Sequence, residues 1–178
     1  MLGGGPASWI GRMHRSAAEL DGWWRVVGGV FSGDPARSRE GGATLGFDRE
    51  RCYGGIDELI AKERTRSDPA EAVAIMTPND THYPLAAAAL DAGLDVVCDK
   101  PVTHDAAQAR DLVSRARRHG RVFAITHGYS AYPMTRYARH LVEAGAIGAL
   151  RYVQVEYIQS GLAARIEDNR RDNRLEWL

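Results

Sequence analysis

The amino-acid sequence predicts an α/β protein built on a parallel sheet with helices on both of its faces. Short apolar runs alternate along the chain with longer amphipathic stretches, which is typical of repeated strand–helix–strand units. The runs are continuously apolar rather than alternating, as expected for strands that are covered on both sides. Glycine or proline stands at the ends of most amphipathic stretches and indicates where each helix begins or stops.

Four apolar runs are the expected strands of this sheet. They are residues 25–31 (RVVGGVF), 72–76 (AVAIM), 95–98 (DVVC) and 122–126 (VFAIT). A first strand is expected to precede the glycine cluster at residues 3–5, and Met1 and Leu2 are what the chain holds of it. A doubly wound sheet places that strand at its centre, so this end of the chain looks truncated.

Four amphipathic stretches are the expected helices. They cover residues 9–20, 83–92, 105–119 and 133–144. The first should bury a stripe that contains Ile10, Met13 and Leu20 at helical spacing. Each of the other three is followed directly by a glycine, which commonly ends a helix.

A change of pattern near Gly148 predicts a domain boundary. Residues 150–158 (LRYVQVEYI) mix apolar with charged side chains, which is typical of a half-exposed strand in a different, more antiparallel sheet. We therefore expect one domain over residues 1–147 and the beginning of a second over residues 148–178. A single strand has no partner for its backbone groups, so this end also looks truncated.

Composition and charge argue against several classes of function. The chain of 178 residues carries 23 basic and 23 acidic side chains, so nothing indicates a general attraction to nucleic acid or anionic lipid. No apolar run approaches the roughly 18–20 residues of a membrane span, and no signal-peptide pattern is present, so we expect a soluble, cytoplasmic protein. Cys52 and Cys98 are expected to be free thiols. We expect no metal site, because the histidines do not have the spacing of metal ligands. These histidines are His82, His104, His119, His127 and His140.

A glycine cluster near the N-terminus is the first candidate site. Gly3 and Gly5 stand at the first two positions of a GxGxxG pattern, and Ser8 stands at the third. Such a turn lets a bare backbone approach a pyrophosphate, and free N–H groups at the start of the following helix face that anion. On this motif alone, a merely flexible glycine-rich terminus is an equally good interpretation.

The end of the predicted strand at residues 25–31 is where an acidic residue would bind the adenosine ribose of NAD. Ser32 stands in its place, and Asp34 lies farther along, where it could simply cap the next helix. Arg37 or Arg39 could meet the 2′-phosphate of NADP, although a solvated arginine is the more common situation. The sequence therefore leaves NAD and NADP open and leans toward tolerance of NADP.

Two further motifs each follow a predicted strand. Residues 77–82 (TPNDTH) come after the strand at 72–76, and residues 99–101 (DKP) come after the strand at 95–98. Ligands bind at the carboxyl ends of strands in open α/β sheets. Taken singly, TPN can be a plain turn and the lysine a solvated surface charge. Their occurrence in this order, after a glycine-rich start, favours a dinucleotide site.

On these residues the sequence resembles the glucose–fructose oxidoreductase/inositol dehydrogenase/rhizopine-catabolism (Gfo/Idh/MocA) oxidoreductases. The resemblance runs from Leu2 to about Ile158 and rests on GGGPAS, TPNDTH, the DKP variant of the family's EKP, and THGY at residues 126–129. It implies a Rossmann domain that binds NAD or NADP, followed by an α/β domain that binds substrate and often forms the dimer. It also implies oxidation or reduction at a hydroxyl or carbonyl carbon, usually of a sugar, cyclitol or related compound.

The resemblance also implies roles for individual residues. Gly3, Gly5 and Ser8 would lie at the pyrophosphate. The nicotinamide ribose and diphosphate side would be lined by Thr77, Pro78, Asn79 and His82, with Asp99, Lys100 and Pro101 close by. Lys100 would be catalytic and approach the reacting oxygen, Asp99 replaces the usual glutamate, and the family often has a cis bond before the residue equivalent to Pro101.

The family's partner in proton transfer is a histidine four residues after an aspartate, in the second domain. The nearest imitation here is Asp172 followed by Glu176, which we interpret as coincidence. We therefore expect the cofactor half of an oxidoreductase, which would form a homo-oligomer at full length. Two other functions stay open from the sequence: a dinucleotide-binding module without catalysis, and a structural or interaction protein on the same scaffold.

Overall fold

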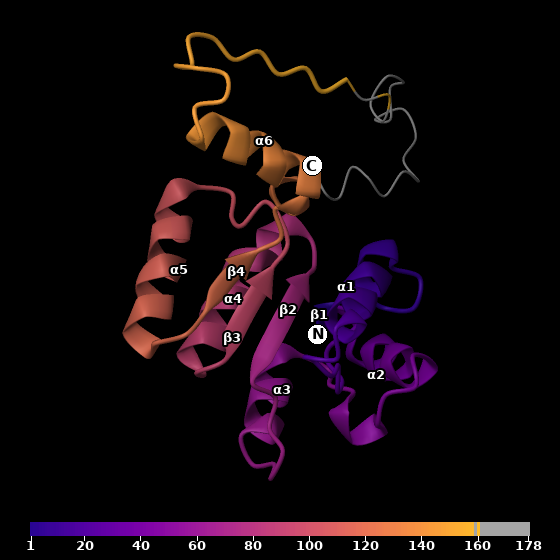
Figure 1. The fold of residues 1–178 in the computed structure, drawn as a ribbon. Coiled ribbons are helices and arrows are strands. Elements are labelled where there is room, and N and C mark those ends of the chain that lie inside the picture. Colours follow the sequence, from indigo (N-terminus) through magenta and orange to yellow (C-terminus); the bar gives the residue numbers. More distant parts are fainter. Residues whose placement is uncertain (159, 161–178) are drawn as a thin grey trace. The chain divides into compact units, whose positions relative to one another are not determined.

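The computed structural model describes residues 1–158 and 160, so the predicted features of residues 161–178, including the pair Asp172 and Glu176, lie outside the described residues. The chain divides into two compact units, one over Met1–Thr126 and one that begins at His127. The domain boundary expected near Gly148 stays a prediction. In the first unit, four parallel strands form one sheet in the order β1-β2-β3-β4 (Figure 1).

The bounds of the elements agree with most of the predicted ones. The strands are β1 (Leu2–Gly3), β2 (Ala72–Met76), β3 (Asp95–Cys98) and β4 (Phe123–Ile125). The helices of the first unit are α1 (Trp9–Leu20), α2 (Pro35–Thr44), α3 (Ile56–Glu63), α4 (His82–Asp91) and α5 (Ala106–His119). Two short 3-10 helices are η1 (Arg49–Arg51) and η2 (Asn79–Thr81). The predicted α/β fold with a parallel sheet is confirmed, whereas α2 and α3 are additional to the predicted helices.

Each face of the sheet has its own hydrophobic cluster. Successive residues of a strand point to opposite faces, so Ile75 and Met76 of β2 lie on different sides. Ile75 belongs to a cluster that includes Leu90 of α4 and Leu112 of α5. Met76 belongs to a second cluster, against which Ile10 of α1 packs. Helices therefore cover both faces, as the continuously apolar strands predict.

The strand predicted over residues 25–31 is much shorter in the structure. Only Gly29 and Val30 are paired, through isolated parallel bridges to Cys52 and Leu2 respectively. The prediction of a full strand is therefore wrong. The reason is that a strand persists only where a neighbour runs beside it, and β1 provides such a neighbour over only two residues.

Helix α1 packs through Gly11 and Ile10, and the expected apolar stripe does not continue to Met13 and Leu20. Met13 and Leu20 are 39% and 82% exposed, and Gly11 is the buried residue of this helix. A Cβ atom on Gly11 would lie 2.5 Å from the Cα atom of Gly4. The helix therefore approaches the glycine turn backbone to backbone, and its N-terminus lies directly at that turn.

The second unit, taken by itself, contains η3 (Gly128–Ala131) and α6 (Pro133–Glu143). The strand predicted over residues 150–158 is not formed, and Val155 and Ile158 are 81% and 92% exposed. A strand needs a neighbour for its backbone N–H and C=O groups, and the described residues provide none for this segment. In the described part of the chain, no helix has the length and apolar character needed to cross a membrane.

Candidate functional site

The glycine turn follows β1 and leads into α1. Gly3 and Gly4 have φ values of 85° and 74°, a left-handed conformation that glycine adopts without strain. Ser8 caps the helix, and its Oγ accepts the N–H of Gly11 at 3.0 Å. Among the described residues, no acceptor bonds to the first two N–H groups of α1, so these donors are available at the turn.

Arg15 of α1 adds a positive charge to the turn and was not singled out from the sequence. Its Nη1 donates to the carbonyl oxygen of Gly4 at 2.8 Å. Gly11 and Arg15 are four residues apart and therefore share one face of the helix. That spacing, read together with the close packing of Gly11 on Gly4, is the signal that identifies Arg15.

Gly5 is constrained by the protein itself as well as by any ligand. A Cβ atom on Gly5 would lie 2.8 Å from the carbonyl oxygen of Phe31. The sequence predicts that this residue leaves its backbone bare for a pyrophosphate. The structure adds that the bare backbone is also required for packing against the bridged segment that ends near Phe31.

Replacing Gly5 by alanine is therefore expected to lower the free energy of unfolding by about 1–3 kcal/mol, because the Phe31 backbone must shift to accept the new methyl group. Gly33→Ala is the matched control, since no atom lies within 4 Å of a Cβ atom there. That control should change stability by less than about 1 kcal/mol. Urea denaturation without cofactor measures both variants, and equal stabilities would contradict the packing argument.

The TPN segment begins beside the glycine turn. The register of β1 and β2 pairs Gly3 with Met76, and a Cβ atom on Gly3 would lie 3.1 Å from Cγ2 of Thr77. The Oγ1 atom of Thr81 lies 2.6 Å from both Thr77 Oγ1 and the Pro78 carbonyl oxygen. These contacts fix the turn from which Thr77, Pro78 and the following η2 helix face the end of the sheet.

His82, the first residue of α4, links the TPN segment to the DKP segment. Its Nδ1 lies 2.7 Å from the carbonyl oxygen of Pro101, and its Nε2 lies 2.9 Å from the carbonyl oxygen of Thr77. The side chain is buried. Because both ring nitrogens are engaged by backbone carbonyls, the predicted contact between His82 and a cofactor would require one of these bonds to break.

The carboxylate of Asp99 is held between α1 and β4. His14 Nε2 lies 3.6 Å from Asp99 Oδ1, and the hydroxyl of Thr126 donates to the same oxygen. Burial favours the neutral acid, but the hydrogen bonds from His14 and Thr126, with the charges of His14 and His82, hold the pKa of Asp99 below its usual value. His14 was not predicted, although it lies three residues after Gly11 and so shares the same face of α1.

Lys100 follows Asp99 at the carboxyl end of β3. The peptide bond between Lys100 and Pro101 is cis, in agreement with the resemblance. The lysine side chain is exposed, and within residues 1–158 no carboxylate pairs with its Nζ. An unpaired ammonium group therefore stands at the same edge of the sheet as the glycine turn and the TPN segment.

The segment that would contact the adenosine ribose has its acidic group already in use. Ser32 Oγ accepts the N–H of Asp34 at 3.2 Å, and the carboxylate of Asp34 caps α2 by accepting the N–H of Arg37 at 2.8 Å. Arg39, the other candidate for a 2′-phosphate, pairs with Glu58 at 2.6 Å. Arg37 is 78% exposed, and its Nε lies 3.8 Å from Asp34 Oδ1, a longer contact than that of Arg39, so Arg37 is the better placed of the two arginines.

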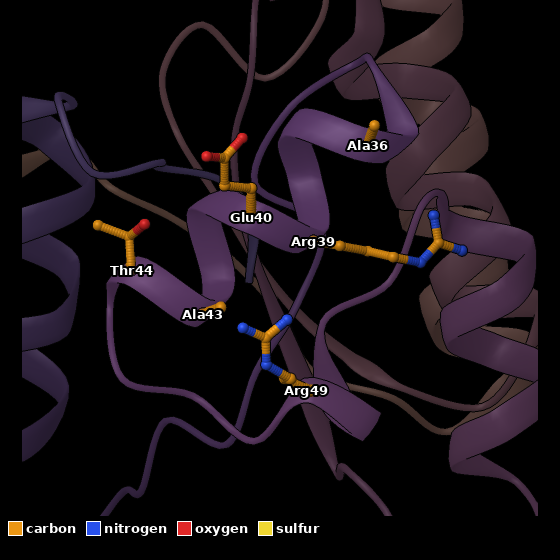
Figure 2. A pocket seen from close by; sticks show the side chains of 6 residues that line it. All are labelled: Ala36, Arg39, Glu40, Ala43, Thr44 and Arg49. Carbon is orange, nitrogen blue, oxygen red and sulfur yellow. The ribbon is translucent and has the colours of Figure 1, made fainter.

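A pocket of about 520 Å³ lies over α2 and η1 (Figure 2). It is lined by Ala36, Arg39, Glu40, Ala43, Thr44 and Arg49. None of these lining residues belongs to the glycine turn, the TPN segment or the DKP segment. Figure 2 shows Arg39 pointing away from Glu40, in keeping with its ion pair to Glu58. The pocket therefore is not the candidate site, which is the open edge at the ends of β1, β2 and β3.

A family model described as an oxidoreductase family with an NAD-binding Rossmann fold, GFO_IDH_MocA, matches residues 1–127. The chain belongs to the Gfo/Idh/MocA oxidoreductase family. The resemblance that GGGPAS, TPNDTH and DKP indicate is thus confirmed, and so is the Rossmann fold. Three parallel strands bring those motifs to one edge of the sheet, as that fold requires.

Other members of this family and their solved structures match most of the chain. The oxidoreductase YfiI of Bacillus subtilis is 37% identical over 158 residues, which are 88% of this chain and 40% of that protein. UDP-N-acetylglucosamine 3-dehydrogenase of Acidithiobacillus ferrooxidans is 32% identical over 147 residues, 83% of this chain and 42% of that protein. The match to these relatives therefore extends past residue 127, where the match to the family model ends.

The solved structures include an inositol dehydrogenase homolog of Azotobacter vinelandii. Complexed with NAD⁺, it has a TM-score of 0.91 and 38% identity, covering 99% of this chain and 47% of that one. Complexed with NADH and myo-inositol, it has a TM-score of 0.82 and 42% identity, covering 85% and 40%. The chain spans less than half the length of each of these relatives.

Proposed function

We propose that this chain is the cofactor-binding part of an oxidoreductase that uses NAD or NADP and acts on a sugar, cyclitol or related hydroxyl or carbonyl compound. The observation that carries the proposal is the meeting of the glycine turn, the TPN segment and the DKP segment at the carboxyl ends of β1, β2 and β3. Two relatives support the substrate class: an inositol dehydrogenase homolog whose structure is complexed with NADH and myo-inositol, and a UDP-N-acetylglucosamine 3-dehydrogenase. A cytoplasmic location and a homo-oligomeric assembly stay predictions.

The glycine turn is suited to hold the diphosphate of a dinucleotide. Two N–H groups at the start of α1 have no acceptor within the described chain, and the guanidinium of Arg15 lies against Gly4. A helix N-terminus and a neighbouring positive charge both favour an anion. In this arrangement Gly3, Gly5 and Ser8 shape the turn, and Arg15 adds to the residues that the sequence predicts.

The TPN and DKP segments are suited to the nicotinamide end. Thr77, Pro78 and Asn79 would line the ribose, and Asp99 with its neighbours would orient the backbone from which Lys100 projects. A bound nicotinamide would supply the hydride chemistry. Lys100 would donate a hydrogen bond to the substrate oxygen and stabilise negative charge on it, because its ammonium group is exposed and has no carboxylate partner within residues 1–158.

Titration of the chain with NADH and with NADPH, followed by the fluorescence of the reduced nicotinamide, tests the proposed function. We expect a saturable change with at least one of the two cofactors. A folded chain that changes the fluorescence of neither cofactor at millimolar concentration would contradict the proposal and favour an interaction protein on the same scaffold.

Arg37→Ala is expected to weaken NADPH binding about tenfold, or about 1.4 kcal/mol, and to leave NADH affinity unchanged, because only NADPH carries a 2′-phosphate on its adenosine ribose. Arg39→Ala is the matched control, since that guanidinium is paired with Glu58. The same titrations measure both variants. A parallel loss of NADH and NADPH affinity in Arg37→Ala would remove Arg37 from the cofactor site.

A further inference from the structure

His82 occupies an unusual position for a buried histidine. Its side chain is 1% exposed at the first residue of α4, and both of its ring nitrogens face backbone carbonyl oxygens. One carbonyl belongs to Thr77, directly after β2, and the other to Pro101, directly after the end of β3. The imidazole therefore bridges the two segments that carry the proposed nicotinamide contacts.

The chemistry of the two acceptors decides how many protons the ring must carry. A carbonyl oxygen accepts hydrogen bonds and cannot donate them, so each of the two contacts requires an N–H on the imidazole. The neutral ring has one N–H, and its other nitrogen would set a lone pair against a carbonyl oxygen at 2.7 or 2.9 Å. The imidazolium ring satisfies both contacts.

The surroundings of His82 include the carboxylate of Asp99. Asp99 interacts electrostatically with His82 and has its own pKa lowered, with burial opposing and His14 and Thr126 contributing hydrogen bonds. Cys98, at the end of β3, stays a neutral thiol because burial and the charge of Asp99 raise its pKa to about 12. The DKP segment is thus held on one side through Asp99 and on the other through the Pro101 carbonyl.

We infer that His82 is a positioning residue: a buried imidazolium that donates to the carbonyl oxygens of Thr77 and Pro101 and holds the TPN and DKP segments at the spacing that one dinucleotide requires. The inference rests on the proposed function for its purpose, although the double hydrogen bond itself does not depend on it. Lys100 lies directly before Pro101, so the same bond also fixes the backbone that presents the ammonium group.

Nitrogen-15 NMR of the histidine rings in the whole chain tests the double hydrogen bond without any cofactor. We expect one histidine with N–H signals on both Nδ1 and Nε2, protected from exchange with solvent near neutral pH, and absent from the spectrum of His82→Phe or His82→Gln. A single protonated nitrogen on His82, with the other in the unprotonated form, would overturn the inference.

NADH titration of variants tests the consequence for binding. His82→Phe keeps a ring but removes both donors, and we expect at least tenfold weaker binding. His82→Gln keeps two N–H donors on its amide and should recover part of that loss. His119→Gln is the matched control, because that ring is at the surface beside Asp91 and should leave the affinity within twofold.

The possible outcomes separate the two claims. Equal NADH affinity in wild type, His82→Phe and His82→Gln would overturn the positioning role. If His82→Phe does not fold, the ring N–H signals of the wild type decide: signals on both nitrogens support the double hydrogen bond, and a signal on only one of them overturns it. If the wild type binds neither NADH nor NADPH, the proposed function fails, and the ring signals still decide whether His82 makes the double hydrogen bond.

Discussion

Replacing Glu63 by alanine is expected to lower the free energy of unfolding by about 3–5 kcal/mol, because it leaves the buried guanidinium of Arg51 without its main partner. Both side chains are buried, with Arg51 Nη2 2.7 Å from Glu63 Oε2 and Arg51 Nε 3.0 Å from Oε1. Tyr53 donates its hydroxyl to Oε1 at 2.5 Å, and the N–H of Ala70 donates to Oε2 at 2.7 Å. Four donors lose a bond at once, and the guanidinium of Arg51 then keeps only its bonds to the carboxylate and the carbonyl oxygen of Asp68.

Urea denaturation of Glu63→Ala measures this loss, and Glu58→Ala is the matched control. Glu58 also pairs with two cations, Arg39 and Lys62, but it lies nearer the surface. Pairs of that kind contribute about 0–1 kcal/mol. Similar losses in the two variants would contradict the account of Glu63 as a buried acceptor.

Acidification should act on the same network. Burial favours the neutral acid, but the hydrogen bonds from Arg51, Tyr53 and Ala70, with the charge of Arg51, hold the pKa of Glu63 below its ordinary value of 4.5. A carboxyl whose pKa is lower in the folded state stabilises that state above its unfolded pKa and loses this contribution as the pH falls. Stability should therefore fall below about pH 4.5, and more steeply in wild type than in Glu63→Gln.

Lys100→Met is expected to reduce turnover about 10²-fold or more while cofactor affinity changes by no more than a few-fold. The physical reason is that Lys100 would stabilise charge on the substrate oxygen, which develops in the transition state rather than on cofactor binding. Turnover is measured in a longer family member that carries the same DKP segment, against a panel of sugars and cyclitols. Cofactor affinity is measured on this chain.

Lys62→Met provides the control for the affinity measurement, because Lys62 is the other lysine of the chain and pairs with Glu58 at the surface. Both lysine variants should bind NADH nearly as wild type does. Comparable turnover with and without Lys100, at saturating cofactor, would remove it from the catalytic role. That result would favour a dinucleotide-binding module without catalysis.

The parts of the site that follow directly from topology could be predicted from the sequence. Thr77 and Lys100 come after apolar runs that are strands in the structure, and parallel neighbours must end at the same edge. The sequence allows Asp34 either to contact the adenosine ribose or to cap the next helix, and the structure shows it as the cap of α2. The placement of these residues depends on the direction of the strands and on local helix capping. Both can be predicted from a few neighbouring residues in the sequence.

The residues contributed by α1 could not be predicted from its apolar pattern. Met13 and Leu20 suggest a buried stripe, but close contact between Gly11 and Gly4 turns a different face toward the sheet. That rotation brings Arg15 to the glycine turn, and His14 to Asp99. A glycine contact has no hydrophobic signature, so the apolar pattern wrongly buries Met13 and Leu20, although Ile10 is packed as predicted.

Helix α2 and the segment at residues 150–158 show two other limits. The buried face of α2 consists of Ser38, Gly41 and Gly42, so its sequence has no apolar period to detect. Residues 150–158 have the side-chain pattern of a strand, but the described chain offers them no neighbouring strand. Side-chain pattern reports a preference, whereas a strand also requires a partner.

The central claim is that a nicotinamide dinucleotide binds at the edge formed by the ends of β1, β2 and β3. Amide NMR spectra of the ¹⁵N-labelled chain, recorded during titration with NADH, test it most directly. The account predicts that the largest shifts fall on residues 3–11, 77–82 and 99–102. Shifts that fall instead on the lining of the α2 pocket, such as Ala43 and Thr44, or no shifts at saturating NADH, would contradict it.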